Sequence, residues 1–173
     1  MDGESETRLA RMEARLQELE DREAIRTLRC RYHECINEGR FAAIPDLFSE
    51  DAELDFAHLG KGKGRREIAA FFGATVGSGS GPAEAEEKPR LYRVKQFIHN
   101  HVVEISGDSG TGYAYLFATP VYAGEAYVVA ARYDDEYVRR DGRWLFRVMR
   151  LTPYYMVPLK EGWAGDDLLK MGR

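Results

Sequence analysis

The sequence predicts a single α+β domain in which helices cover one face of a curved antiparallel sheet and leave a concave interior. Helical periodicity dominates the chain up to Thr75, whereas β-rich runs separated by tight turns extend from Leu91 to Tyr155. Helices followed by strands is the order typical of an α+β domain. The chain has 173 residues, of which 44% are hydrophobic, so it can bury one substantial core.

Two helical segments are predicted at the N-terminus. Apolar residues recur at spacings of three and four in the first segment, at Leu9, Met12, Leu16 and Leu19. This narrow stripe fits either a short coiled-coil contact with another copy or a helix that folds back on its own domain. The second segment starts near Glu20 and ends at Gly39, and its inward face consists of Ile25, Leu28, Tyr32 and Ile36.

Shorter elements fill the middle of the chain. The sequence predicts a short helix over 41–48 and a short strand over 54–56. The glycine turn that follows has neither the P-loop spacing nor the dinucleotide fingerprint; it contains Gly60, Gly62 and Gly64. A helix over 65–75 is expected to turn Ile68, Phe71 and Phe72 inward, and a mobile Gly- and Ser-rich loop to follow over 77–89.

Four long strands joined by tight turns are predicted to form an antiparallel meander, over 92–105, 111–122, 126–139 and 144–155. We expect three parts in the chain: an N-terminal helical extension over 1–20, the domain itself over 21–155, and a C-terminal tail over 156–173. The tail and the end of the last strand are rich in large apolar side chains. We therefore expect this region to cover the mouth of the concave interior as a lid or to contact a partner subunit.

Composition excludes several classes of partner. The formal charge is −4 and no basic stripe is present, so nucleic acid is not an expected partner. No apolar run could span a bilayer and the N-terminus has no signal-peptide pattern, so we expect a cytoplasmic protein without a membrane partner. Cys30 and Cys35 are interpreted as reduced packing residues, because their spacing suits neither a metal site nor a disulfide. We expect no metal and no other cofactor.

Several local phrases, in this order and spacing, resemble the SnoaL-like branch of the nuclear transport factor 2-like superfamily. They are Asp21-Arg22-Glu23-Ala24-Ile25, Asn37-Glu38-Gly39-Arg40-Phe41, Asp46-Leu47-Phe48-Ser49-Glu50-Asp51-Ala52, Gly64-Arg65-Arg66-Glu67-Ile68, Asn100-His101-Val102-Val103-Glu104-Ile105, and Arg132-Tyr133-Asp134-Asp135-Glu136 with Asp141-Gly142-Arg143-Trp144. The resemblance implies a cone-like fold around a deep hydrophobic pocket. It also implies dehydratase, ketosteroid isomerase or polyketide cyclase chemistry, usually without metal or organic cofactor.

The chain departs from the family pattern at the two residues that would carry the chemistry. Where dehydratase-like members have a Tyr followed five residues later by an Asp, this chain has Tyr32 and Asn37. Where they have a His four residues before an Asn on the first long strand, it has Gln96 and Asn100. Asn and Gln cannot take up a proton near neutral pH, so the usual Asp–His dyad cannot operate at these positions.

Other residues are weighed as replacements for the dyad. His58, oriented by Asp55, is the candidate catalytic pair, with Tyr32 as a third catalytic candidate. His99 and His101 should face away from the pocket if Gln96 and Asn100 face into it, unless a β-bulge reverses one of them. His33 is expected to point to solvent or to a neighbour, because it follows Tyr32 on the helix.

The expected ligand-binding residues come from several elements and are Asn37, Gln96, Asn100, Arg147, Phe56 and Phe72. Arg147 and Arg150 have opposite parity on the last strand, so at most one of them should enter the cone. The run from Arg132 to Glu136 is interpreted as solvated charges with a structural Arg–Asp pair.

Three functions remain open at this point. The first is a cofactor-independent lyase or isomerase acting on a small hydrophobic cyclic substrate. The second is a non-catalytic small-molecule binding module, and the third is an assembly subunit like the β chains of ring-hydroxylating dioxygenases. For each, we expect a homo-oligomer, either dimer or trimer, because the apolar stripe, the outer sheet face and the tail together offer much apolar surface.

Overall fold

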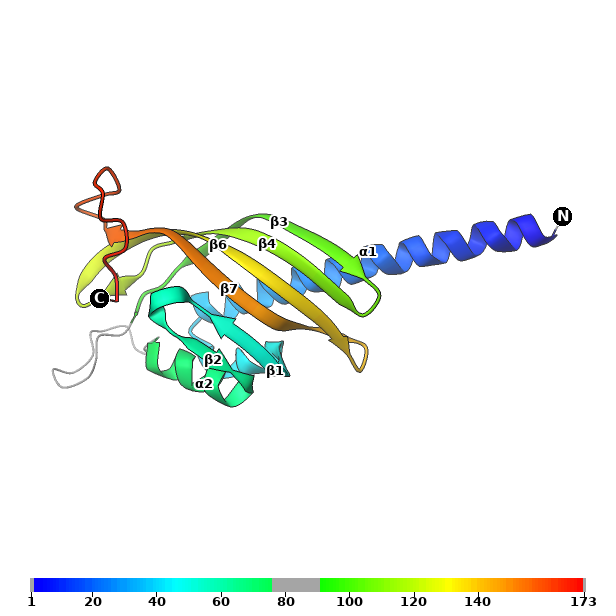
Figure 1. The fold of residues 1–173 in the computed structure, drawn as a ribbon, viewed down its shortest axis with the longest axis horizontal. Helices are drawn as coiled ribbons and strands as arrows, with labels where there is room; N and C mark the ends of the chain where they lie inside the picture. The colour runs from blue at the N-terminus through cyan, green and yellow to red at the C-terminus, as the bar shows by residue number, and fades with distance from the viewer. Residues whose placement is uncertain (1, 76–90, 173) are drawn as a thin grey trace.

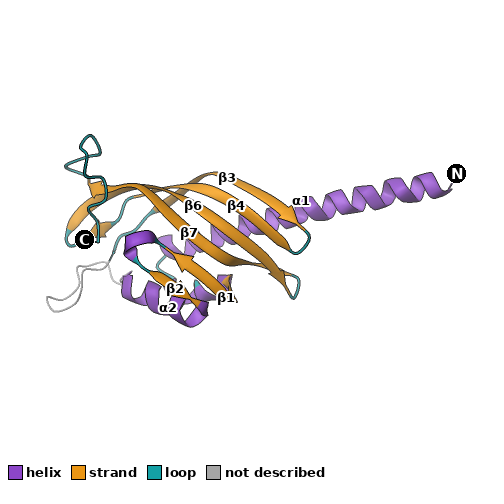
Figure 2. Ribbon diagram, viewed as in Figure 1, coloured by secondary structure: helices purple, strands orange, loops and turns teal. Residues whose placement is uncertain are grey.

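A long N-terminal helix packs across a strongly curved sheet, and a small subdomain of two short strands and one helix closes one side (Figure 1). The computed structural model describes residues 2–75 and 91–172. The loop predicted over 77–89 lies outside the described residues. The predicted class is confirmed: the molecule is an α+β domain of cone-like form with helices on the concave side of the sheet (Figure 2).

The helix α1 is continuous from Asp2 to Asn37, whereas the sequence predicts two segments. Residues 3–20 are exposed and project from the body of the molecule (Figure 1). Asp21 marks the point where the helix meets the sheet: its buried carboxylate accepts hydrogen bonds from Arg139 and from the indole N–H of Trp144, at 2.9 and 2.8 Å. Just after the helix, Gly39 adopts a φ of 70°, which favours glycine.

Seven strands make up the sheet, and they run in the spatial order β2-β1-β7-β6-β4-β3, with β5 paired only to β6. Their bounds are Phe48–Asp55 for β1, Lys61–Lys63 for β2, Gln96–Ser106 for β3, Ser109–Ala118 for β4, Val121–Tyr122 for β5, Glu125–Arg140 for β6 and Arg143–Pro158 for β7. β1 pairs with β7 in parallel and the other pairs are antiparallel. The four predicted long strands are therefore confirmed, with ends shifted by a few residues.

The helix α2, Gly64–Thr75, buries Ile68 and Phe72 against β1. Two 3-10 turns, over Phe41–Ala43 and Pro45–Leu47, replace the helix predicted over 41–48. A third 3-10 turn, over Ala57–Leu59, joins β1 to β2.

Two of the register shifts between paired strands determine which predicted site residues face the interior. The register of β3 against β4 shifts between His99 and Val102, where Asn100 has a φ of 52°. The register of β6 against β7 shifts between Glu136 and Tyr137, opposite Arg147. Because side chains alternate along a strand, each bulge exchanges the inner and outer faces beyond it.

The core lies between α1, α2 and the inner face of the sheet. The predicted inward face of α1 is confirmed, because Ile25, Leu28, Tyr32 and Ile36 are all buried. Cys35 is buried, but the packing role predicted for Cys30 is wrong, because Cys30 is exposed. No helix in residues 2–75 or 91–172 is long and apolar enough to cross a membrane.

Candidate functional site

An apolar cavity of about 50 Å³ lies in the concave interior, between α1, α2 and the sheet. Phe56 and Phe72, both predicted to line a pocket, lie on its wall. Most other lining residues are aliphatic or sulfur-containing, among them Leu59, Leu116, Met156 and Met171. Met171 belongs to the C-terminal tail, so the tail reaches the cavity. This is the position expected of the tail if it acts as a lid.

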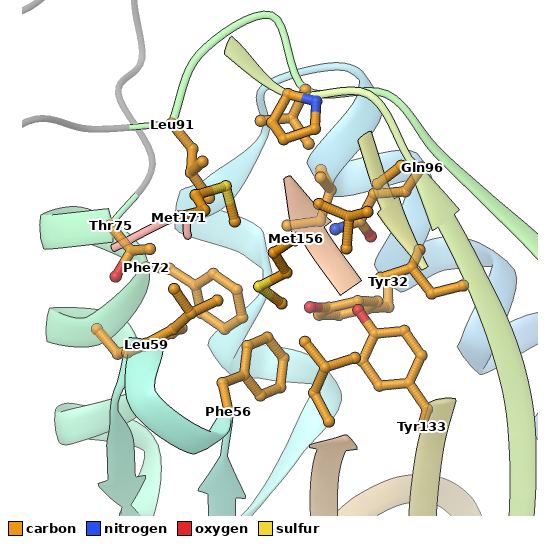
Figure 3. A pocket seen from close by; sticks show the side chains of 18 residues that line it. Tyr32, Phe56, Leu59, Phe72, Thr75, Leu91, Gln96, Tyr133, Met156 and Met171 are labelled. Carbon is orange, nitrogen blue, oxygen red and sulfur yellow. The ribbon is translucent and has the colours of Figure 1, made fainter. Parts of the chain in front are cut away.

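Polar groups enter this apolar cavity from Tyr32 on α1, Tyr133 on β6 and Gln96 at the start of β3, and Thr75 at the end of α2 adds a hydroxyl to the lining (Figure 3). Both tyrosines are 0% exposed. Neither hydroxyl makes a hydrogen bond of standard geometry to a described residue, although the two hydroxyls lie close enough together for each to affect the pKa of the other. A buried hydroxyl without a partner costs free energy, so two of them directed into one cavity indicate a place where a ligand atom can complete the hydrogen bonding.

Both hydroxyls stay protonated at neutral pH. Burial raises the pKa of Tyr133 to about 12, and the nearby guanidinium of Arg29 only partly opposes this rise. Burial and the neighbouring Tyr133 also raise the pKa of Tyr32 well above its ordinary value. The two groups therefore act as neutral hydrogen-bond donors rather than as tyrosinate bases.

A buried ion pair lies behind the tyrosines. The guanidinium of Arg29 pairs with the carboxylate of Asp135 and lies 4.4 Å from the ring centroid of Tyr133. Burial opposes the charge of Arg29, but the carboxylate of Asp135 outweighs burial and raises the pKa of Arg29. Asp135 also accepts a hydrogen bond of 2.9 Å from the hydroxyl of Tyr137. A permanent positive charge thus stands against the face of a cavity tyrosine.

The amide of Gln96 is held by His33. The Nδ1 atom of His33 lies 2.7 Å from Oε1 of Gln96, and His33 is only 6% exposed. Burial and the charge of Arg29 hold the pKa of His33 well below its ordinary value, so its ring is neutral. In that state Nδ1–H donates to Oε1, which leaves the Gln96 NH₂ group as a donor into the cavity (Figure 3). Of the two places expected for His33, solvent is wrong, because its ring is buried against the Gln96 side chain.

The side chain of Asn37 forms hydrogen bonds with backbone groups and does not line the cavity. Its Nδ2 donates to the carbonyl of Gln96 at 3.0 Å, and its Oδ1 accepts from the backbone N–H of Gln96 at 2.7 Å. This two-bond clamp joins the C-terminal end of α1 to the first residue of β3. Asn37 is not among the residues that line the cavity, although the sequence predicts a ligand-binding role for it.

The structure does not bring His58 and Asp55 together as a dyad. The carboxylate of Asp55 accepts from Lys61 and from the backbone N–H of Ala57. The exposed ring of His58 lies 2.8 Å, at Nε2, from the backbone carbonyl oxygen of Met171. Neither residue lines the cavity, because the 3-10 turn after β1 directs His58 to the tail.

The two bulges also move Asn100, His101 and Arg147 from their predicted places. Asn100 sits in the β3 bulge and is exposed, whereas His101 turns inward and lies 3.1 Å, at Nε2, from the hydroxyl of Tyr137. Burial and the charge of Arg29 lower the pKa of His101 to about 4. Arg147 and Arg150 both pair with Glu136 on the outer face, so neither enters the cone.

The sequence interpretation missed Tyr133, His33 and the Arg29–Asp135 pair. The run from Arg132 to Glu136 does contain the expected exposed pair, between Arg132 and Asp134. Asp135, however, is buried, because β6 continues to Arg140 and its alternation sends residues 133, 135 and 137 inward. That alternation is the signal that could have found Tyr133 and Asp135. Among the described residues no group of His, Cys, Asp and Glu could hold a metal ion.

Solved structures with this fold are numerous, and two illustrate it. A hexachlorocyclohexane dehydrochlorinase, LinA-type3 from Novosphingobium barchaimii, is 21% identical with a TM-score of 0.72, and the match covers 87% of this chain and 98% of that chain. An NTF2-like protein with a cystatin-like fold from Novosphingobium aromaticivorans is 24% identical with a TM-score of 0.61, covering 94% and 97%. No match was found among curated protein sequences.

The model of one protein family matches most of the chain. It is described as the SnoaL-like domain, and it matches residues 17–150. This range contains α1 from Gln17 onward, the cavity tyrosines and Gln96, and it ends within β7. The chain shares its fold with an NTF2-like protein, and the resemblance identified in the sequence is confirmed by the family model: the chain belongs to the SnoaL-like domain family.

Proposed function

We propose that this protein is a cofactor-independent lyase that acts on a small hydrophobic cyclic molecule bound in the cavity. The observation that carries the proposal is the pair of fully buried hydroxyls of Tyr32 and Tyr133, directed into an apolar cavity beside the Gln96 amide and without a hydrogen bond of standard geometry to any described residue. An apolar wall with a few convergent polar groups is typical of small-molecule sites. The LinA-type3 neighbour is named for an elimination reaction, dehydrochlorination, which supports the lyase class.

The three donors match the charge change of an elimination next to a carbonyl group. When a proton leaves the carbon beside the carbonyl, negative charge gathers on the carbonyl oxygen. Hydrogen bonds from Tyr32, Tyr133 and Gln96 to that oxygen would become stronger as the charge develops. The fixed positive charge of Arg29 behind Tyr133 would favour the same change, reduced by its pairing with Asp135.

A second candidate function, a non-catalytic binding module, is favoured by a specific observation. Tyr32 and Tyr133 are the only ionisable side chains among the described residues that line the cavity, and both are held neutral. Without a base, the proton would pass to water or to a group on the substrate. A general base typically contributes about 10²–10⁴-fold, so the expected turnover is slow.

Dehydration of 3-hydroxy-1-tetralone separates the two candidates. The cavity of about 50 Å³ must widen to admit this bicyclic molecule, which the flexible side chains of Met156 and Met171 in its lining allow. The C2–H and C3–O bonds break, water leaves, and the product rearranges to 1-naphthol, whose fluorescence reports the reaction. We expect the wild-type protein to accelerate dehydration, and Tyr133→Phe to lower the rate by about 10–100-fold because one donor is lost. Tyr154→Phe is the matched control, because Tyr154 is 46% exposed, outside the cavity lining, and should keep the wild-type rate.

The outcome assigns the function. Binding of 1-tetralone without acceleration of any hydroxy ketone in a panel would replace the lyase proposal by the binding module. An equal loss of rate in Tyr133→Phe and Tyr154→Phe would show that the effect is not caused by the cavity donor.

A further inference from the structure

The N-terminal half of α1 carries an apolar stripe that the described part of the chain leaves exposed. Leu9, Met12, Leu16 and Leu19 are 57–60% exposed, on the part of the helix that projects from the body (Figure 1). An isolated helix of this length is marginally stable in water, and large apolar side chains on it favour packing against a partner.

This stripe faces away from the domain that the same helix supports. An α-helix turns about 100° per residue, so two residues nine positions apart lie on opposite sides of it. Leu16 and Ile25 are nine apart, and so are Leu19 and Leu28; the first of each pair is exposed and the second is buried against the sheet. The helix is continuous through both pairs, so this relation holds in the folded chain. A partner helix on the stripe therefore meets neither the sheet nor α2.

The charges that flank the stripe point to the identity and the direction of the partner. With Leu9 and Leu16 at heptad position a, and Met12 and Leu19 at position d, the e positions are all acidic: Glu6, Glu13 and Glu20. The g positions are all basic: Arg8, Arg15 and Arg22. In a parallel pair of identical helices each g residue lies near the following e residue of the partner, so Arg8 meets Glu13 and Arg15 meets Glu20.

An antiparallel pair would have the opposite electrostatics. There the g positions face each other and the e positions face each other, which would bring arginine to arginine and glutamate to glutamate. Beyond Leu19 the next a and d positions are Glu23 and Arg26, which form an ion pair of 3.9 Å within the helix. The apolar seam therefore ends where the helix reaches its own domain.

We propose that residues 5–22 of α1 form a parallel two-stranded coiled coil with a second copy of this chain. The two domains then lie on opposite sides of the paired helices, and both cavities remain on the side away from the contact. The narrow apolar stripe favours a helix as the partner. The charges at the e and g positions favour an identical helix that runs in the same direction.

Charge reversal in the full-length protein tests the contact. Sedimentation should give twice the 19.7 kDa of one chain at micromolar concentration. Arg8→Glu with Arg15→Glu makes every e and g position acidic except Arg22, and Glu13→Arg with Glu20→Arg makes all of them basic except Glu6. Each double variant alone should dissociate at least about tenfold more readily, because four attractive pairs become repulsive. A mixture of the two should restore the dimer.

Three results would overturn the contact or its stoichiometry: a wild-type monomer, a wild-type trimer, or double variants that dimerise as well as the wild type. The substitutions lie on exposed helix positions and exchange good helix formers, so the fold should persist, which the circular dichroism spectrum checks.

Disulfide trapping tests the direction. In a Cys30→Ser background, Leu9→Cys should cross-link to its own copy under mild oxidation, because like positions face each other in a parallel pair. In an antiparallel pair Leu9 would face Leu19 of the other copy. The two Leu9 positions would then lie about 15 Å apart along the axis, too far to cross-link. Cross-linking only between Leu9→Cys and Leu19→Cys chains would overturn the parallel arrangement.

Discussion

Replacing Tyr133 by Phe should leave the unliganded protein at least as stable as the wild type. Phenylalanine keeps the buried ring against Arg29 and removes a hydroxyl that makes no hydrogen bond of standard geometry in the described part of the chain. An unsatisfied buried donor costs about 1–3 kcal/mol, and a cavity water would recover part of it. We therefore expect the free energy of unfolding to rise by about 0–1.5 kcal/mol.

Tyr137→Phe is the matched comparison, because Tyr137 is also a buried tyrosine of β6. Its hydroxyl donates to Asp135 at 2.9 Å and lies 3.1 Å from Nε2 of His101. Removing this hydroxyl takes a hydrogen bond from a buried carboxylate, so the free energy of unfolding should fall by about 1–3 kcal/mol.

The assay is urea unfolding of both variants and the wild type at one protein concentration, followed by circular dichroism. A fixed concentration matters because dimer formation would also stabilise the folded chain. Equal destabilisation by Tyr133→Phe and Tyr137→Phe would refute the reasoning. It would mean that the Tyr133 hydroxyl has a structural partner and is not available to a ligand.

Three further results are expected. Asn37→Asp should lower the free energy of unfolding by about 1–2 kcal/mol at pH 8, and by less at pH 5, because the carboxylate cannot donate to the Gln96 carbonyl; urea unfolding at the two pH values checks this. The free energy of unfolding should reach its highest value above about pH 6.5 and fall towards pH 4. In this range histidine takes up a proton in the unfolded chain, whereas His101 in the folded chain, with a pKa of about 4, does not. His101→Gln should therefore make the free energy of unfolding less dependent on pH, which urea unfolding at several pH values checks. Asp135→Asn should cost about 3–5 kcal/mol, because it leaves the buried charge of Arg29 uncompensated; thermal unfolding that matches the wild type would contradict the ion pair.

The arrangement of elements could be predicted from the sequence because hydrophobic period and turn residues are local signals. The inward face of α1 and the long strands follow directly from the spacing of apolar residues and the position of glycine turns. Tyr32 and Gln96 were placed at the pocket by resemblance to the family, and Phe72 was turned inward by the apolar spacing of its helix. These three residues and Phe56, also predicted to bind the ligand, line the cavity.

The orientation of several polar residues could not be predicted, because it depends on two bulges. Simple alternation along β3 places Asn100 inside and His101 outside, and the register shift after His99 reverses both. The same holds for Arg147, which the irregularity between β6 and β7 leaves on the outer face beside Arg150. One inserted residue in a strand leaves no clear mark in the apolar pattern.

Contacts between residues far apart in the sequence could not be predicted from local patterns either. His33 and Gln96 are 63 positions apart, and Arg29 and Asp135 are 106 apart. Each of these residues alone has an ordinary surface interpretation, and only the packing of α1 on β3 and β6 brings the partners together.

The central claim is that Tyr32, Tyr133 and Gln96 recognise one acceptor atom on an otherwise apolar ligand. Calorimetric titration of 1-tetralone and of tetralin, which differ by the ketone oxygen, measures that recognition directly. The wild-type protein should bind 1-tetralone about tenfold or more tightly than tetralin, and Tyr32→Phe with Tyr133→Phe should abolish most of the preference while leaving tetralin binding unchanged. Equal affinity of the wild-type protein for both compounds, or an unchanged preference in the double variant, would contradict the account.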